Sequence, residues 1–481
     1  MSSALLWILV PLALGVALLF YSRQDAFPGL LASLTCLFLS LAAWQLPLDV
    51  VMQLGPFTVE IAPSFIMLGR SFTLGEAQTP LLAFIYLLEA FWLLGAFFAK
   101  PGRLFVPISL ICVGLLVASL AVEPFLYAAL LIAVAAMLII PLMVPPGSRP
   151  GPGVQRFLKY QIFAVPFILF TGWILSGVEA SPGNLDLVLR AGLLLALGFT
   201  FLLALFPFHS WVPLLAKECH PYVFGFLVFF LPSIALIFGL GFFDRYAWLR
   251  DGNFAYPLVV WAGALATLLA GLWVAAERHP VRMFAFAAMA NIGFGLQAVG
   301  LGGVQSAQVF FALWLPQALA MWVWATALGA IGSDQLPGRV SDSPSIPSTH
   351  PGLAASLLLA AFSLAGLPAL GGFPGRLALL DGIAAVSPLA AVATLAGSLG
   401  LLIGALRMLV QLMPREQGGR QKWTEEAEVD KPPSHRIQMT GLYAWVLLAI
   451  SAVGLVGFGV LPQLFLSSVP GMAAMFTQLL P

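Results

Sequence analysis

Charged residues are scarce in this sequence. Among 481 residues there are 21 lysines and arginines and 20 aspartates and glutamates, so 9% of the chain is charged and the formal net charge is +1. Soluble globular chains average about 25% charged residues, and a nucleic-acid-binding domain needs a basic surface. The composition therefore excludes a water-soluble enzyme, a disordered protein and a partner for nucleic acid.

Cysteine and other metal-binding side chains are also few. The three cysteines, Cys36, Cys112 and Cys219, are far apart and odd in number, which excludes a disulfide framework and a CxxC metal pair. Cys219 stands beside Glu218 and His220, but no further ligands follow at a suitable spacing. We interpret the cysteines as ordinary apolar or loop residues and predict no metal site.

Apolar residues, by contrast, make up 61% of the chain. A helix that crosses the hydrocarbon core of a bilayer needs about 20 of them in succession, and long runs without alternation favour helices over a barrel. The sequence therefore predicts an all-α polytopic membrane protein with about fourteen transmembrane helices. The predicted spans are 3–21, 28–46, 79–99, 104–121, 124–144, 158–176, 188–208, 222–241, 257–275, 283–301, 306–331, 353–385, 389–412 and 441–463.

The basic residues predict an orientation, because cytoplasmic loops carry an excess of lysine and arginine. With the N-terminus outside, 15 of the 21 basic residues fall in cytoplasmic loops, four fall outside, and two, Arg376 and Arg407, lie within spans. We therefore expect both termini on the outer face of an energy-coupling membrane of the bacterial cytoplasmic type. Residues 47–78 form a predicted outer loop, 332–352 a linker, and 413–440 a charged cytoplasmic loop. No soluble domain is predicted, so no nucleotide, flavin or other cofactor site is expected on this chain.

Two predicted spans are interrupted by proline and glycine. The first break contains Pro207, and the second contains Pro368, Gly371, Gly372 and Pro374. Proline removes a helix hydrogen bond, and paired breaks in two halves of a chain are typical of inverted-repeat transporters with sites near the bilayer midplane. We predict N-terminal spans in 1–103, five-helix repeats in 104–241 and 257–412, the charged loop 413–440, and a last span with its tail in 441–481.

Five segments carry a family resemblance. They are TLGEAQTP (73–80), FPFHSWVPLLAKECHPYVFG (206–225), HPVRMFAFAAMANIGF (279–294), SLAGLPALGGFPGRLALL (363–380) and VGFGVLPQLFL (456–466). In this order they resemble the antiporter-like, proton-translocating subunits of respiratory complex I and of Mrp cation/proton antiporters. The resemblance implies fourteen helices, inverted repeats, and other membrane subunits as partners. It places quinone and iron–sulfur clusters in partner subunits only.

The resemblance also implies where a proton relay would lie. The family's ionisable positions correspond to Ala133, Leu202, Ile234, Asn291 and Met321 in this sequence. These side chains cannot change charge near neutral pH, and Arg376, at a sixth family position, stays protonated. We therefore predict a degenerate proton channel and a role in scaffolding or coupling.

Five ionisable residues remain inside or beside predicted spans as candidates for another ion route. Glu89 is expected to pair with a neighbouring helix or subunit, or to be protonated, because an unpaired charge at the bilayer centre costs roughly 2.5–3.5 kcal/mol. Arg376 and Asp381 are expected to form a local ion pair. Arg407 either snorkels to the membrane surface or pairs with Asp381. His209 either caps the first break or shuttles protons.

Three functions remain open at this point. The first is a membrane-arm subunit of a complex-I-type NAD(P)H- or ferredoxin-quinone oxidoreductase, without a redox site of its own. The second is an active proton- or cation-translocating subunit that uses a non-standard route. The third is a membrane subunit of an Mrp-like or inorganic-carbon uptake complex. The span pattern is common to all three.

Overall fold

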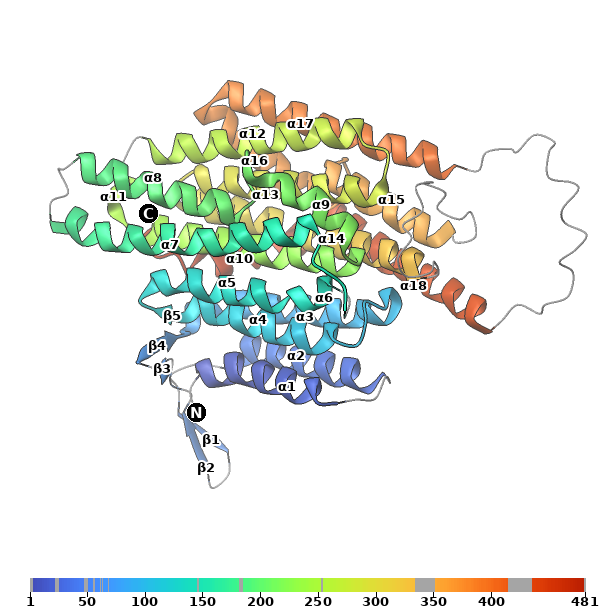
Figure 1. The fold of residues 1–481 in the computed structure, drawn as a ribbon, viewed down its shortest axis with the longest axis horizontal. Coiled ribbons are helices and arrows are strands. Elements are labelled where there is room, and N and C mark those ends of the chain that lie inside the picture. Colours follow the sequence, from blue (N-terminus) through green and yellow to red (C-terminus); the bar gives the residue numbers. More distant parts are fainter. Residues whose placement is uncertain are drawn as a thin grey trace, which may run out of the picture.

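The computed structural model describes residues 3–21, 26–46, 51–54, 57–60, 62, 64–67, 69–144, 147–180, 185–251, 254–333, 351–413 and 435–479. Its helices lie side by side, with α1 and α2 at one edge and α12 and α17 at the other (Figure 1). The helices are α1 (Val10–Leu19), α2 (Phe27–Gln45), α3 (Thr79–Ala99), α4 (Phe105–Ala121), α5 (Ala128–Leu138), α6 (Ile140–Met143), α7 (Pro152–Ala180), α8 (Leu185–Leu202), α9 (Trp211–Glu218), α10 (Pro221–Arg245), α11 (Ala247–Arg250), α12 (Ala255–Ala276), α13 (Pro280–Gly300), α14 (Gly303–Ser333), α15 (Pro351–Ala365), α16 (Gly372–Val386), α17 (Pro388–Leu412), α18 (His435–Val460), α19 (Gln463–Leu466) and α20 (Val469–Ala473).

Helix length and composition confirm a polytopic helical membrane protein. Within the described ranges, nine helices are long and apolar enough to cross a membrane, and Trp445–Val460 with Gln463–Ala473 forms a further pair bent by 80°. Three shorter apolar helices are Leu5–Leu19, Phe105–Ala121 and Pro351–Ala365. Several long helices begin with proline in the first turn, where its missing N–H is tolerated.

The centre of the bundle consists of α10, α13 and α14. In the most apolar window of each helix, 94%, 100% and 89% of the residues are buried, whereas α2, α12 and α17 are each 44% buried. A helix that is apolar on all sides is stable only when it is surrounded by other helices or by lipid. The three central helices are surrounded by protein, so polar side chains on them face a protein interior.

Residues 47–78 contain strands in addition to connecting loop, which corrects the purely helical expectation. β1 (Val51–Leu54) pairs antiparallel with β2 (Phe57–Glu60), while β3 (Ser64–Met67), β4 (Arg70–Thr73) and β5 (Val122–Glu123) form a second antiparallel sheet. Phe72 lies opposite both Phe65 and Val122. Strand pairing satisfies backbone groups of a segment that leaves the helical bundle, and the sequence analysis missed it because each strand has only two to four residues.

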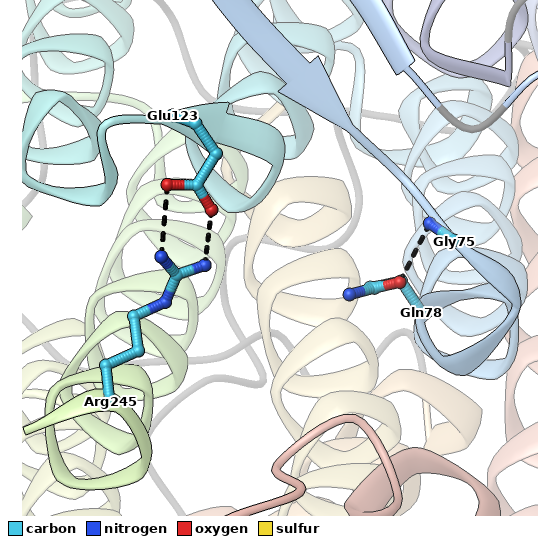
Figure 2. A network of polar contacts seen from close by, with 4 residues as sticks. All are labelled: Gly75, Gln78, Glu123 and Arg245. Carbon is cyan, nitrogen blue, oxygen red and sulfur yellow. Dashed lines mark hydrogen bonds and ion pairs between the residues drawn. The ribbon is translucent and has the colours of Figure 1, made fainter.

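An ion pair ties this sheet to the central helix α10. Arg245, at the end of α10, donates two hydrogen bonds to the Glu123 carboxylate of β5, at 3.1 and 2.6 Å (Figure 2). In the same view, the backbone N–H of Gly75 donates to Gln78 Oε1 at 2.9 Å, just before α3 begins. The ion pair therefore anchors the sheet to the bundle, while the Gly75 contact is local to the turn that leads into α3.

The two interrupted regions are both non-helical in the structure. α8 ends at Leu202, a 3-10 turn spans Phe208–Ser210, and α9 begins at Trp211. α15 ends at Ala365 and α16 begins at Gly372. In the second break, Gly371 N donates to the carbonyl of Leu455 in α18 at 2.7 Å. A freed backbone group thus finds a partner in a neighbouring helix, as lipid-embedded backbone must.

Two predicted connections fall largely outside the described residues. These are 334–350 of the predicted linker and 414–434 of the predicted charged loop. The charged loop is shorter than expected at its C-terminal end, because α18 begins at His435 rather than near residue 441.

Candidate functional site

A polar cavity lies between the three central helices. It is lined by Ser233 of α10, Asn291 of α13, and Trp314, Gln317 and Met321 of α14, together with apolar side chains. Both side-chain polar atoms of Asn291, Nε2 of Gln317 and Nε1 of Trp314 have no hydrogen-bond partner within the described ranges. A buried polar group without a partner costs about 1–3 kcal/mol, so polar character concentrated in one cavity points to a functional region.

Arg376 lies in α16, just after the second break, with 5% of its surface exposed. Its Nη2 donates to the carbonyl of Leu364, on the other side of the break. The guanidinium carbon is 4.1 Å from the ring centroid of Phe294 in α13, which is a cation–π geometry. Arg376 therefore joins the two halves of the broken span to α13.

The expected ion pair between Arg376 and Asp381 is not formed. Three ion pairs are present among the described residues, and they join Asp186 to Arg190, Glu123 to Arg245, and Glu277 to Arg282. Asp381 is exposed while Arg376 is buried. Five residues on an α-helix turn the side chain by about 140°, so the two residues lie on different faces of α16.

Arg407 also does not pair with Asp381. Its Nη1 donates to the carbonyl of Ala275, in the last turn of α12. The last carbonyls of a helix have no intrahelical donor and carry partial negative charge, so a cation is favourable there. Arg407 thus connects α17 to the end of α12.

His209 lies in the 3-10 turn of the first break. Its ring stacks on Trp273 of α12, with centroids 4.6 Å apart, and on Phe206 at 5.8 Å. Its Nδ1 has no hydrogen-bond partner in the described part of the chain, so this atom does not cap a helix there. His209 is held by ring stacking in a small cleft between the break and α12.

Glu89 lies in α3 with 0% of its surface exposed. Neither carboxylate oxygen has a hydrogen-bond partner among the described residues. The neighbouring hydroxyl of Ser109 in α4 instead donates to the carbonyl of Val106 at 3.1 Å. Ser109 is the polar side chain that α4 places beside Glu89, and no charged group of a neighbouring helix pairs with Glu89 among the described residues. An isolated buried charge is too costly, which favours the protonated acid, the other alternative for this residue.

Comparisons with known proteins show which family this chain resembles. A family model described as the transmembrane region of NADH:quinone oxidoreductase and Mrp antiporters matches residues 174–406. NADH-quinone oxidoreductase subunit N of Methylobacterium nodulans is 29% identical over 215 residues, which cover 43% of this chain and 42% of the relative. Subunit N 1 of Solidesulfovibrio magneticus is 28% identical over 311 residues, 62% of this chain and 61% of the relative. These matches support an antiporter-like subunit of the complex I and Mrp superfamily.

Solved structures share the fold of this antiporter-like subunit. A chain of the Mrp complex from Dietzia sp. has a TM-score of 0.78 at 18% identity and covers 99% of both chains. A chain of respiratory complex I from Thermus thermophilus has a TM-score of 0.71 at 22% identity, covering 99% of this chain and 100% of that one. The curated alignments to NADH-quinone oxidoreductase subunits N are shorter: the chain matches 42% and 39% of the length of two of those relatives.

The five positions that the resemblance assigns to a relay are all buried in this antiporter-like subunit. They are Ala133 of α5, Leu202 of α8, Ile234 of α10, Asn291 of α13 and Met321 of α14. Asn291 and Met321 line the polar cavity, and Ser233, the neighbour of Ile234, lines it too. Ala133 and Leu202 are not among its lining residues. The cavity thus contains amide, indole and thioether groups where a relay needs groups that gain and lose protons.

Sequence reasoning missed Gln317 and Trp314. A glutamine within the apolar run of α14 was a usable signal, since a buried amide needs partners. The orientation of Trp314 was not predictable, because tryptophan in a membrane helix is equally common at the lipid interface. Only the packing of α10 against α13 and α14 brings these side chains together.

A second polar cluster joins α3 to the central helices. The Tyr222 hydroxyl of α10 donates to the carbonyl of Trp92, and Trp322 Nε1 of α14 donates to the carbonyl of Phe91 at 2.8 Å. Gly95 makes this possible, because a Cβ there would lie 2.3 Å from Tyr222 Oη and 2.6 Å from Trp322 Nε1. The cluster fixes the N-terminal helices against the bundle centre.

The segment before α10 is a capping structure. The Glu218 carboxylate accepts hydrogen bonds from the backbone N–H groups of Gly153 at 2.7 Å and Val154 at 3.0 Å, in the first turn of α7. His220 Nδ1 accepts from Tyr222 N at 3.2 Å, and burial lowers the pKa of His220 to about 4. Among the described residues, no group of three or more histidine, cysteine, aspartate or glutamate side chains is placed to hold a metal ion.

Proposed function

We propose that this chain is a membrane-arm subunit of a complex-I-type NAD(P)H- or ferredoxin-quinone oxidoreductase, and that it serves as a scaffold or coupling element with a degenerate proton channel. The observation that carries the proposal is the polar cavity, where Asn291 and Met321 occupy relay positions without an ionisable side chain. A proton relay through α13 and α14 lacks its carriers. Structural links such as the Tyr222 cluster and the Arg376 contacts fit a rigid connecting subunit.

The proposal includes a membrane topology. We propose fourteen crossings, inverted five-helix repeats in 104–241 and 257–412, and both termini on the outer face. The nine long helices, the bent pair, the three shorter apolar helices and α8 are compatible with that number. The remaining units are the N-terminal spans in 1–103, the cytoplasmic loop 413–440 and the final segment 441–481. The distribution of basic residues supports the orientation.

Partners are an essential part of this function. We propose that quinone and iron–sulfur clusters are bound by partner subunits and that this chain contributes membrane contacts alone. The relatives and structural neighbours named for NADH-quinone oxidoreductase, complex I and Mrp are parts of multi-subunit membrane assemblies. The apolar faces of α2 and α17 supply surface for such neighbours or for lipid.

The alternative of an active ion route rests on Glu89, whose carboxyl lacks a partner in the described chain. The other candidates, His209, Arg376, Asp381 and Arg407, lie at separate places, and no hydrogen bond or ion pair joins any two of the five in the described ranges. Proton transfer needs hydrogen-bond contact directly or through a water. The Mrp-like or inorganic-carbon uptake complex is a third possibility, supported by the TM-score of 0.78 to an Mrp chain.

Two measurements test this proposal. A tagged chain purified in mild detergent should co-purify with iron–sulfur and quinone-reducing subunits; a soluble zinc-containing partner would indicate carbon uptake instead. In vesicles containing the complex, we expect Glu89→Gln and His209→Ala to leave the number of protons moved per electron unchanged, as should the surface control Glu76→Gln. A reduced proton ratio in Glu89→Gln alone, with electron transfer intact, would refute the scaffold role.

A further inference from the structure

An apolar cleft of about 100 Å³ lies between helices of the first half of the bundle and helices of the second. Its walls come from α8 and α12, and its floor comes from α10 and α13. Aromatic rings line it, including Phe199, Phe242 and Phe254. Pockets that hold a whole ligand commonly measure about 300–1,000 Å³, so a cleft of about 100 Å³ can take only part of a molecule.

The cleft opens on the apolar outer face of the bundle. Leu193 of α8 is 65% exposed, and Leu258, which lines the cleft from α12, is 55% exposed. Leu189, Leu197 and Leu265 continue this exposed apolar surface on both sides. In a membrane protein such a mouth is in contact with acyl chains rather than with water.

Charged groups lie at one end of the cleft. α8 begins near Asp186 and Arg190, which form an ion pair at 2.8 Å. Arg250, at the end of α11, donates to the carbonyls of Phe243 and Asp244, and both Phe243 and the neighbouring Leu249 line the cleft. The lining itself is apolar, and the arginines beside it are already engaged, Arg190 with Asp186 and Arg250 with backbone carbonyls.

We propose that this cleft binds part of one acyl chain of a membrane phospholipid. Apolar walls and a mouth on the lipid-facing surface match such a chain. A transmembrane helix of a partner is too wide, because a helix is about 10 Å across and the cleft offers only about 100 Å³. The inference does not depend on the proposed function, since it requires no ion flux and no redox partner.

Two substitutions by larger residues, one in α10 and one in α8, are suited to the test. Gly239 lines the cleft, and a Cβ there would lie 3.4 Å from the Phe199 ring, which the site can accommodate. Gly239→Leu therefore fills the cleft, and Ala196→Phe fills it from α8. Gly457 of α18 has nothing within 4 Å of an added Cβ, so Gly457→Leu is a matched control on another surface.

The experiment uses the full chain in nanodiscs with a phosphatidylglycerol that carries a diazirine at the end of one acyl chain. Illumination should give adducts on α8, α10 and α12 residues of the cleft. We expect Gly239→Leu and Ala196→Phe to lower the adduct yield about tenfold, because each would exclude about two methylenes of the acyl chain from the cleft. Gly457→Leu should leave the adduct yield unchanged. Thermal melting of each variant verifies that it is folded. If one of the two cleft variants fails to fold, the adduct yield of the other cleft variant decides the test.

Three outcomes would overturn the proposal. The first is an adduct distribution spread evenly over the lipid-facing helices, without enrichment in the cleft. The second is displacement of the probe by a polyprenyl quinone but not by unlabelled phospholipid, which would make the occupant a quinone tail. The third is a cross-link in the purified complex that places a partner's side chains inside the cleft.

Discussion

The second helix break depends on Gly366, and its replacement gives a quantitative test of how that break is built. Gly366 has φ +77°, and a Cβ there would lie 2.8 Å from Arg376 Cδ and 3.0 Å from Arg376 Nη1. An L-residue in this backbone conformation costs about 1–2 kcal/mol. Overpacking against the buried arginine adds about 1–3 kcal/mol. We therefore expect Gly366→Ala to lower the free energy of unfolding by about 2–5 kcal/mol.

The chain contains a control for the backbone term alone. Gly303 has φ +55° and nothing within 4 Å of an added Cβ, so Gly303→Ala should cost only about 1–2 kcal/mol. In an Arg376→Ala background the steric term disappears, and Gly366→Ala should then cost about as much as Gly303→Ala. The difference between the two backgrounds is the coupling energy between Gly366 and Arg376.

Equilibrium unfolding in mixed detergent micelles, followed by circular dichroism, measures these four variants. The reasoning is wrong if Gly366→Ala is no more destabilising than Gly303→Ala. It is also wrong if the cost of Gly366→Ala is the same with and without Arg376. Either result would mean that Arg376 does not pack against the break as described.

Two further predictions concern the segment at the start of α10. Burial lowers the pKa of His220 from 6.5 to about 4, so the folded state favours neutral His220. The stability that neutral His220 preserves is therefore complete above about pH 6.5. It is lost as the pH falls towards 4, by at most ~3 kcal/mol. Melting temperatures between pH 7.5 and 4.5 should fall less steeply in His220→Asn, which retains a capping oxygen, and equal slopes would refute the assignment. Tyr222→Phe removes the hydrogen bond to Trp92 O and should cost about 1 kcal/mol in the same unfolding assay; a loss of less than a few tenths would show that the hydroxyl does not hold α3.

The polar interior shows how far sequence reasoning reaches in this protein. Apolar run length predicted the helical membrane fold, and proline and glycine predicted both breaks, because these features act within a few residues of the chain. The prediction that Arg376 pairs with Asp381 was wrong, because it rested on their proximity in sequence. The rotation of the helix places the two side chains on different faces of α16. The contacts that Arg376 makes instead, with Leu364 and Phe294, come from the break and from α13.

The sequence by itself determined that the chain lives in a membrane and where its helices are interrupted. These properties follow from composition and local pattern, since lipid admits long apolar helices and few charges. Tertiary structure alone decided that Asn291, Trp314 and Gln317 share one cavity, that Glu89 has no partner in the described chain, and that α8 and α12 border an apolar cleft. The physical reason is that each depends on which face of one helix packs against another, and that choice is made by side chains distant in the sequence.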